Sequence, residues 1–167
     1  MKILKLSVLL FILFLSCTKI STEETELRHY PINKIGGIIS QTEVEIDNEI
    51  SSDGDGSLKI VSEAPTVIEL YETTNLDVED ATLIYSAKVK TDNMQGQVYL
   101  EMWCAFEGKG EYFSRGLDKS IAGTNDWKKL ETNFFLNPGE NPNNIKLNLV
   151  IAGTGTVWID DIRLVKR

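Results

Sequence analysis

The chain closes with Gly153-Thr-Gly-Thr-Val-Trp-Ile-Asp-Asp-Ile-Arg-Leu-Val-Lys-Arg167, and the pattern of this stretch predicts the fold class. A Gly-x-Gly turn leads into branched and aromatic residues, which favour a β-strand. Strict alternation would give one face Trp158, Asp160, Ile162 and Leu164, and the other face Val157, Ile159, Asp161 and Arg163. The carboxylate of Asp160 would then lie in an apolar stripe, where it needs hydrogen bonds, a countercharge or a metal ion.

From Gly36 onward, runs of strand-forming residues alternate with clusters of turn residues, and no stretch has a helical period. The predicted strands cover residues 38–46, 57–61, 66–72, 82–91, 97–106, 112–117, 127–136, 144–151 and 156–165. Many short strands at this spacing are typical of an all-β sandwich or jelly roll.

Three stretches resemble the carbohydrate-binding-module type of jelly roll in the galactose-binding-like superfamily. Gly155 to Leu164 resembles the closing strand of that family. Gly54-Asp-Gly-Ser-Leu-Lys-Ile60 resembles an early strand, and Asn125-Asp-Trp-Lys-Lys-Leu-Glu-Thr132 resembles a late strand led by tryptophan. The resemblance implies an all-β jelly-roll sandwich over residues 35–167, with Trp127 in its core.

Residues 1–16 have the features of an export signal. Two lysines precede an apolar run at residues 6–15, which is too short to cross a membrane as a helix. Ser16 and Cys17 follow, and this end resembles the lipobox of bacterial lipoproteins, with Phe14 at the position where Leu is usual. The resemblance implies that Cys17 is lipidated, and the alternative is an ordinary secreted protein. Two or more acyl chains would hold the protein on a membrane.

Residues 17–34 are polar and lack a hydrophobic period, so they are predicted to form a flexible tether. The only histidine, His29, is expected to be solvated there. Thr18 stands where Asp would indicate retention in the inner membrane, and the resemblance to sorted lipoproteins therefore implies an exported protein of the cell envelope, anchored in the outer membrane.

Composition excludes some partners and some chemistry. The formal net charge is −8, and nucleic acid is an unsuitable partner because its phosphates require a basic face. If Cys17 is acylated, Cys104 has no partner for an intramolecular disulfide. Cys104 alternates with apolar residues, and we expect it to be a small buried hydrophobe.

One face of the predicted sheet combines aromatic and polar side chains. The strand at 97–106 turns its apolar residues to the core and Tyr99, Glu101 and Trp103 to the other side. If neighbouring strands join the same sheet, that face also carries Lys88, Ser86, Lys146 and Asn148. The segment 111–115 adds Tyr112 and Arg115, although the pattern leaves open whether Tyr112 or Phe113 faces the core.

Such a face suits a poly- or oligosaccharide, because aromatic rings stack on sugars while polar groups bind their hydroxyls. The resemblance implies the same ligand. The sequence therefore predicts a carbohydrate-binding module on a lipid-anchored protein. An alternative is an interaction module in which Tyr99 and Trp103 anchor an envelope protein partner.

A second predicted site is acidic. The resemblance implies a structural calcium ion held by Asp160, by the loop containing Asp53 and Asp55, and by Glu45 or Glu43 near the N-terminus of the domain. Calcium requires six to eight oxygen ligands. The alternative is a glycine turn with solvated aspartates, in which Asp160 accepts backbone N–H groups.

Catalysis is not predicted. Glycoside hydrolysis needs two carboxyl groups beside the bond, and Glu101 is the only acid assigned to the candidate face. The sequence also lacks a nucleophile elbow, a phosphate-binding loop and metal-binding histidine spacing.

Overall fold

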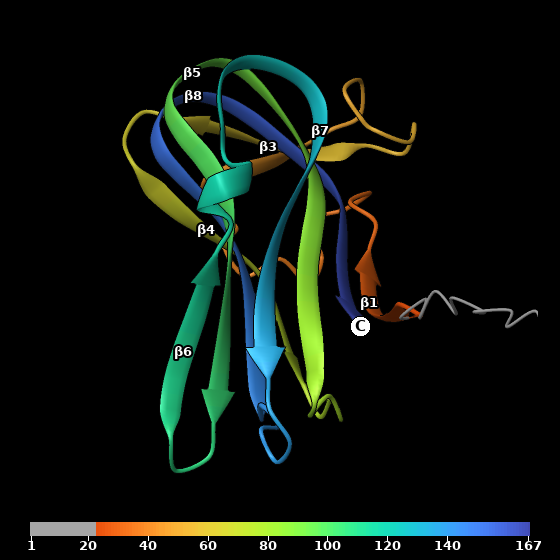
Figure 1. The fold of residues 1–167 in the computed structure, drawn as a ribbon. Helices are drawn as coiled ribbons and strands as arrows, with labels where there is room; N and C mark the ends of the chain where they lie inside the picture. The colour runs from red at the N-terminus through yellow and green to blue at the C-terminus, as the bar shows by residue number, and fades with distance from the viewer. Residues whose placement is uncertain (1–22) are drawn as a thin grey trace, which may run out of the picture.

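A computed structural model describes residues 23–167, and these residues form an all-β fold (Figure 1). The strands are β1 (Thr25–Tyr30), β2 (Val44–Asp47), β3 (Ser57–Ser62), β4 (Thr66–Thr74), β5 (Ala81–Phe106), β6 (Gly110–Arg115), β7 (Ile121–Leu136) and β8 (Asn144–Lys166). A single 3-10 turn, η1 (Leu117–Lys119), precedes β7. The predicted all-β sandwich is therefore confirmed. No helix within residues 23–167 is long and apolar enough to cross a membrane.

The long strands β5 and β8 each contribute to two layers. The end of β5 pairs with β6 and with the start of β8, and β4 pairs with the other side of that part of β8. We call these four segments the β4–β6 layer. The start of β5 pairs with β7 and with the end of β8, which also pairs with β3 and β1, while β2 pairs with β3. These segments form the β2–β7 layer.

Both long strands bend where they cross from one layer to the other, and glycines permit the bend. A Cβ atom on Gly153 would lie 1.7 Å from the carbonyl oxygen of Gln95, and one on Gly96 would lie 2.2 Å from that of Ala152. No other residue fits at such distances. Two pairs of predicted strands, 82–91 with 97–106 and 144–151 with 156–165, are thus each one bent strand.

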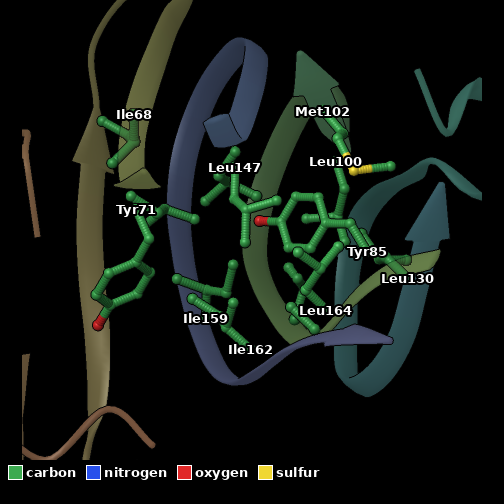
Figure 2. Packing of buried hydrophobic residues seen from close by; sticks show 14 of the residues in the cluster. Ile68, Tyr71, Tyr85, Leu100, Met102, Leu130, Leu147, Ile159, Ile162 and Leu164 are labelled. Carbon is green, nitrogen blue, oxygen red and sulfur yellow. The ribbon is translucent and has the colours of Figure 1, made fainter. Parts of the chain in front are cut away.

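The core lies between the two layers (Figure 2). Leu100, Met102 and Leu147 come from the β4–β6 layer, and they meet Ile159 and Leu164 of the β2–β7 layer. The thiol of Cys104 is also fully buried, as predicted, and burial raises its pKa to about 12. The neutral thiol therefore acts as an apolar core group.

The strict alternation predicted for the closing strand is wrong after Ile159. Val157 and Ile159 face the core, but so do Ile162 and Leu164, because a bulge at Asp160 and Asp161 changes the parity. Asp161 has a φ of 51° at this bulge, a conformation that aspartate tolerates better than most residues. Trp158 consequently lies outside the core cluster, and its indole Nε1 donates to Oδ2 of Asp47 at 2.9 Å.

The tether predicted for residues 17–34 is wrong from Thr25 onward. Residues 25–30 form β1, which pairs with the end of β8, and Ile32 is buried in the core. His29 is not simply solvated, because its Nε2 lies 2.9 Å from Oδ1 of Asp161. The export signal and Cys17 lie outside the described residues.

Two further expectations fail locally. The predicted strand at residues 38–46 forms only at Val44–Asp47. Trp127 is half-buried on β7 and is not among the residues of the core cluster or those packed against it. Its place in the core was implied by the resemblance alone, and the register shifts where β7 meets β5 alter which side chains face inward there.

Candidate functional site

The candidate site is the surface of the β4–β6 layer that faces away from the core, here called the outer face. On β5, Tyr99, Glu101 and Trp103 alternate with core residues and therefore point to this side. The paired strands β4, β6 and β8 place further side chains beside them. The site is thus built on a rigid sheet instead of on loops.

The strand register arranges these side chains in rows across the sheet. One row is Glu69, Asn148, Glu101 and Arg115, taken from β4, β8, β5 and β6. The next row is Glu72, Lys146, Trp103 and Phe113. Side chains that are directly opposite on neighbouring strands lie within contact distance, so each row is a continuous set of neighbours.

Glu101 is the centre of a hydrogen-bond network on this face. Its side chain is almost fully buried, and Oε1 accepts the Trp103 indole N–H at 2.7 Å and the Asn148 amide at 3.4 Å. The other oxygen, Oε2, accepts Nε of Arg115 at 2.5 Å. The hydrogen bond from Arg115 to this carboxylate raises the pKa of the guanidinium. The network fixes the orientation of the Trp103 and Arg115 side chains.

An aromatic surface lies next to this network. The rings of Trp103 and Phe113 have centroids 4.9 Å apart at an angle of 45°, and the guanidinium of Arg115 lies 4.5 Å from the Phe113 centroid. Tyr99 lies in the neighbouring row, opposite Val150. Two aromatic rings and a cation therefore share one end of the outer face.

Acidic side chains dominate the rest of the face. Lys146 Nζ donates to Glu111 Oε1 at 2.9 Å, and this ion pair raises the pKa of the ammonium. The Asn144 amide donates to the carboxylate of Glu72. Glu69 and Glu72 are both exposed on β4. The two cations of the face are thus paired, and the exposed β4 carboxylates leave an excess of negative charge.

The structure brings together six of the residues predicted for this face: Tyr99, Glu101, Trp103, Arg115, Lys146 and Asn148. Lys88 is not among them, and its predicted place on this face is wrong. It lies in the β2–β7 layer opposite Asp160 and Lys129, with Nζ 3.4 Å from Oδ2 of Asp161. Ser86 belongs to the same layer. Both residues precede the bend in β5, and the sequence pattern alone did not show that this strand changes layer.

Tyr112 is also placed elsewhere. Phe113 pairs with Trp103 on the outer face, so Tyr112 points to the opposite side of β6, where its ring meets Phe106 at 6.0 Å. Phe113, Glu69 and Glu72 are the face residues that sequence analysis did not assign. Knowing that β4 adjoins β8 in this layer would have identified the two glutamates.

The predicted calcium ligands do not converge. Glu45 pairs with Lys59 at 2.7 Å, and Asp53 and Asp55 are exposed in the loop before β3. Asp160 is fully buried, and its carboxylate accepts the backbone N–H groups of Ser52 and Asp161 at 2.9 and 2.7 Å. In the part of the chain from residue 23 onward, no group of three or more histidine, cysteine, aspartate or glutamate side chains could hold a metal.

Some features of the loop before β3, which contacts Asp160 through the Ser52 N–H, nevertheless fit a cation. Ser52 Oγ is buried and has no hydrogen-bond partner among residues 23–167. Beside Gly56, the carbonyl oxygens of Ile32 and Asp47 approach within 3.3 and 3.4 Å of the position that a Cβ would occupy. Carbonyl, hydroxyl and carboxylate oxygens are the ligands that calcium prefers. Asp160 and this loop therefore suit an oxygen-bound ion, whereas Asp53, Asp55 and Glu45 do not contribute.

Comparison with known proteins supports the fold. No protein-family model and no curated protein sequence matches the chain. Among solved structures, the CBM22-1 xylan-binding domain of Paenibacillus barcinonensis Xyn10C matches with a TM-score of 0.59 and 12% identity, over 85% of this chain and 94% of that one. The chain has the fold of the β-sandwich carbohydrate-binding modules.

Two other structures agree with this result. The CBM22-1–GH10 modules of the Clostridium thermocellum xylanase Xyn10B, complexed with xylohexaose, match with a TM-score of 0.62 and 14% identity. The match covers 85% of this chain and 28% of the xylanase chain. A family 16 carbohydrate-binding module matches with a TM-score of 0.57 and 12% identity, over 80% of this chain and 93% of that module. At such identities the likeness concerns the fold.

Proposed function

We propose that this protein is a non-catalytic carbohydrate-binding module that binds a poly- or oligosaccharide on its outer face. The observation that carries the proposal is the Trp103–Phe113 aromatic surface beside the Glu101–Arg115–Asn148 network. A sugar ring stacks its apolar side on the aromatic rings. The amide and guanidinium groups then donate to its hydroxyls, and they are already held in place before the ligand arrives.

The same network argues for binding instead of catalysis. The carboxylate of Glu101 accepts three donors, and one of them is the cation of Arg115. A catalytic carboxyl group must reach the substrate, and a buried carboxylate whose two oxygens already accept these donors is not free to do so. Glu101 is therefore suited to orienting its neighbours.

A glycan array with the purified protein tests the proposal. Wild-type protein should bind a defined set of glycans, and Trp103→Ala should lose that binding while remaining folded. Val61→Ala is a suitable control, because Val61 is an exposed apolar residue of β3 in the other layer. A folded wild-type protein that binds no glycan would contradict the proposal and favour the alternative of a protein-interaction module.

We also propose that the module is exported to the cell envelope and held on the outer membrane through a lipid on Cys17. The support is the basic and apolar pattern of residues 1–16 followed by Ser16-Cys17. Mass spectrometry of the protein from membranes should show an acylated N-terminal cysteine, and Cys17→Ser should release the protein into the soluble fraction. An unmodified Cys17 in membrane-derived protein would contradict the anchor.

A structural calcium ion near Asp160 is the third part of the proposal. Its donors would be Asp160, the buried Ser52 hydroxyl and carbonyl oxygens near Gly56, and its role would be to join the loop before β3 to β8. The midpoint of thermal unfolding should rise with added calcium and fall with a chelator in wild-type protein. Asp160→Asn should abolish this difference. An equal midpoint under both conditions in the wild type would contradict the site.

A further inference from the structure

The edge strand β6 exposes aromatic residues on both of its faces. Among the strands of the described residues it pairs with β5 alone, and the order of strands ends there. Alternation places Phe113 on the outer face and Tyr112 on the opposite side. Both rings are about half exposed, at 49% and 51% respectively. Exposed aromatic side chains that are grouped together commonly mark a binding surface.

The side of β6 that carries Tyr112 forms one wall of a groove, and β7 forms the other. The hairpin between β5 and β6 and the end of β7 lie at the same end of the molecule (Figure 1). The groove has a volume of about 320 Å³ and is lined by Phe106, Tyr112, Phe113, Phe134 and Phe135, together with Lys109 and Glu140. Phe135 is 74% exposed, so the groove opens to solvent.

The groove is held in shape by contacts beside it and within its walls. Ser114 Oγ and Thr132 Oγ1 lie 2.9 Å apart and join β6 to β7. The Tyr112 hydroxyl donates to the Lys109 carbonyl at 3.2 Å, and the Phe106 ring contacts both Tyr112 and Phe134. The aromatic walls are therefore largely preorganised, which lowers the entropic cost of binding.

The groove is continuous with the outer face. Phe113 lines the groove and also contacts Trp103 on the outer face. We propose that the groove between β6 and β7 is a second glycan-binding subsite, and that a long polysaccharide chain passes from the outer face over β6 at Phe113 into it. This inference rests on the proposed function of the outer face.

The chemistry of the groove favours a glycan over other occupants. Aromatic walls with a few polar groups are the composition expected for a sugar subsite. Among its lining residues the groove has one carboxylate, Glu140, and one cation, Lys109, so it offers no excess of positive charge to an anionic membrane surface. A stable protein interface takes about 20 to 30 residues on each partner, whereas seven residues line this groove.

Isothermal titration with oligosaccharides of two lengths tests the subsite. The probes are the β-1,4-linked hexasaccharides and trisaccharides of xylose, glucose and mannose. A trisaccharide can be held by the outer face alone, whereas a hexasaccharide reaches the groove. Tyr112→Ala/Phe135→Ala should weaken hexasaccharide binding about tenfold, which is the loss of about 1.4 kcal/mol, and change trisaccharide binding less than about twofold.

Two controls separate failure of the groove from failure of the outer face. Trp103→Ala should weaken both lengths, and Val61→Ala should weaken neither. If the double variant binds both lengths as the wild type does, or weakens both equally, the second subsite is overturned while the outer face stands. If folded wild-type protein binds none of the probes, both proposals are overturned. Thermal unfolding of each variant shows that the chain is folded in every titration.

Discussion

Arg115 Nε donates to Glu101 Oε2 at 2.5 Å, and this contact joins the edge strand β6 to β5 on the outer face. Glu101 is only 4% exposed, whereas Arg115 is substantially exposed. The buried carboxylate therefore depends on its donors, while the guanidinium can still reach a ligand. Glu101 therefore contributes mainly to the stability of the fold, whereas Arg115 can also contribute to ligand binding.

Glu101→Gln should reduce both properties. The amide keeps the shape of the side chain but removes its charge, which weakens the hydrogen bonds from Trp103 and Arg115. We expect a loss of about 1–2 kcal/mol in the free energy of unfolding, measured with chemical denaturant, together with weaker glycan binding.

Arg115→Gln is the matched comparison for this prediction. A double-mutant cycle of the two substitutions should show that their effects on stability are not additive, because they share one contact. Additive effects would contradict the view that the pair acts as a unit.

Gly153→Ala should be severely destabilising. The new Cβ would lie 1.7 Å from the Gln95 carbonyl oxygen, so the crossing of β5 and β8 must open. We expect a loss of at least about 3 kcal/mol in the free energy of unfolding, at the upper end of overpacking effects.

Gly36→Ala is the control for this substitution. At Gly36 the nearest atom to a new Cβ is in the flexible Lys34 side chain, at 3.7 Å. Its free energy of unfolding should change by no more than about 0.5 kcal/mol. Equal stability of the Gly153 and Gly36 variants would contradict the close approach of the two strands.

This crossing also shows how far the sequence could predict the fold. Alternation identified the β class and the core side of β5, because a period of two is a local property. It did not show that the predicted strands at residues 82–91 and 97–106 are one bent strand that belongs to both layers, since the bend depends on the contact between Gly153 and Gln95. For that reason Lys88 was assigned to the wrong layer. Phe113 was left undecided because Tyr112 beside it is also aromatic, and only pairing with Trp103 separates the two.

The bulge at Asp160–Asp161 gives a similar lesson. A bulge adds one residue to a strand, and only its pairing partners reveal it. The sequence pattern thus placed Ile162 with Trp158, although these residues lie on opposite sides. The strand β1 was missed because its short polar segment, Thr25–Tyr30, becomes a strand only by pairing with the end of β8.

Asp161 predicts how stability depends on pH. Partial burial raises the pKa of its carboxyl group. Hydrogen bonds from Arg163 and His29 and the charge of Lys88 lower that pKa by more than burial raises it, so the pKa lies below its ordinary value of 3.8. The unfolded state therefore binds this proton more readily than the folded state. The stability that the group contributes is fully present above pH 3.8 and is lost as the pH falls through the lower pKa of the folded state.

Asp161→Asn tests this dependence. Asparagine tolerates the positive φ of the bulge, so the backbone should be retained. Denaturant unfolding between pH 6 and pH 2 should show a smaller loss of stability at acidic pH in the variant than in the wild type. Identical pH profiles would show that the group contributes nothing to acid sensitivity.

Ile32→Ala tests whether residues before 35 belong to the domain. Ile32 is in the core cluster, and the Tyr30 ring stacks on Tyr71 with centroids 3.8 Å apart. Removing the buried side chain should cost about 2–4 kcal/mol in the free energy of unfolding. The exposed residue Ile39 offers a control, and Ile39→Ala should cost less than about 1 kcal/mol. If the two variants were equally stable, residues near 32 would be a tether after all.

The charge of the outer face predicts which glycans it rejects. Glu69 and Glu72 are exposed on β4, while Lys146 and Arg115 are already paired with Glu111 and Glu101. A polysaccharide that carries uronic acids should therefore bind more weakly than a neutral chain with the same backbone. Glu69→Gln/Glu72→Gln should strengthen binding of the acidic chain about two- to tenfold at low salt and leave binding of the neutral chain almost unchanged.

Titrations of both polymers at low and high ionic strength measure this effect, and it should shrink in high salt because the carboxylates are solvent-exposed. A variant that gains affinity for both polymers alike would show that the two glutamates obstruct the face by shape instead of by charge.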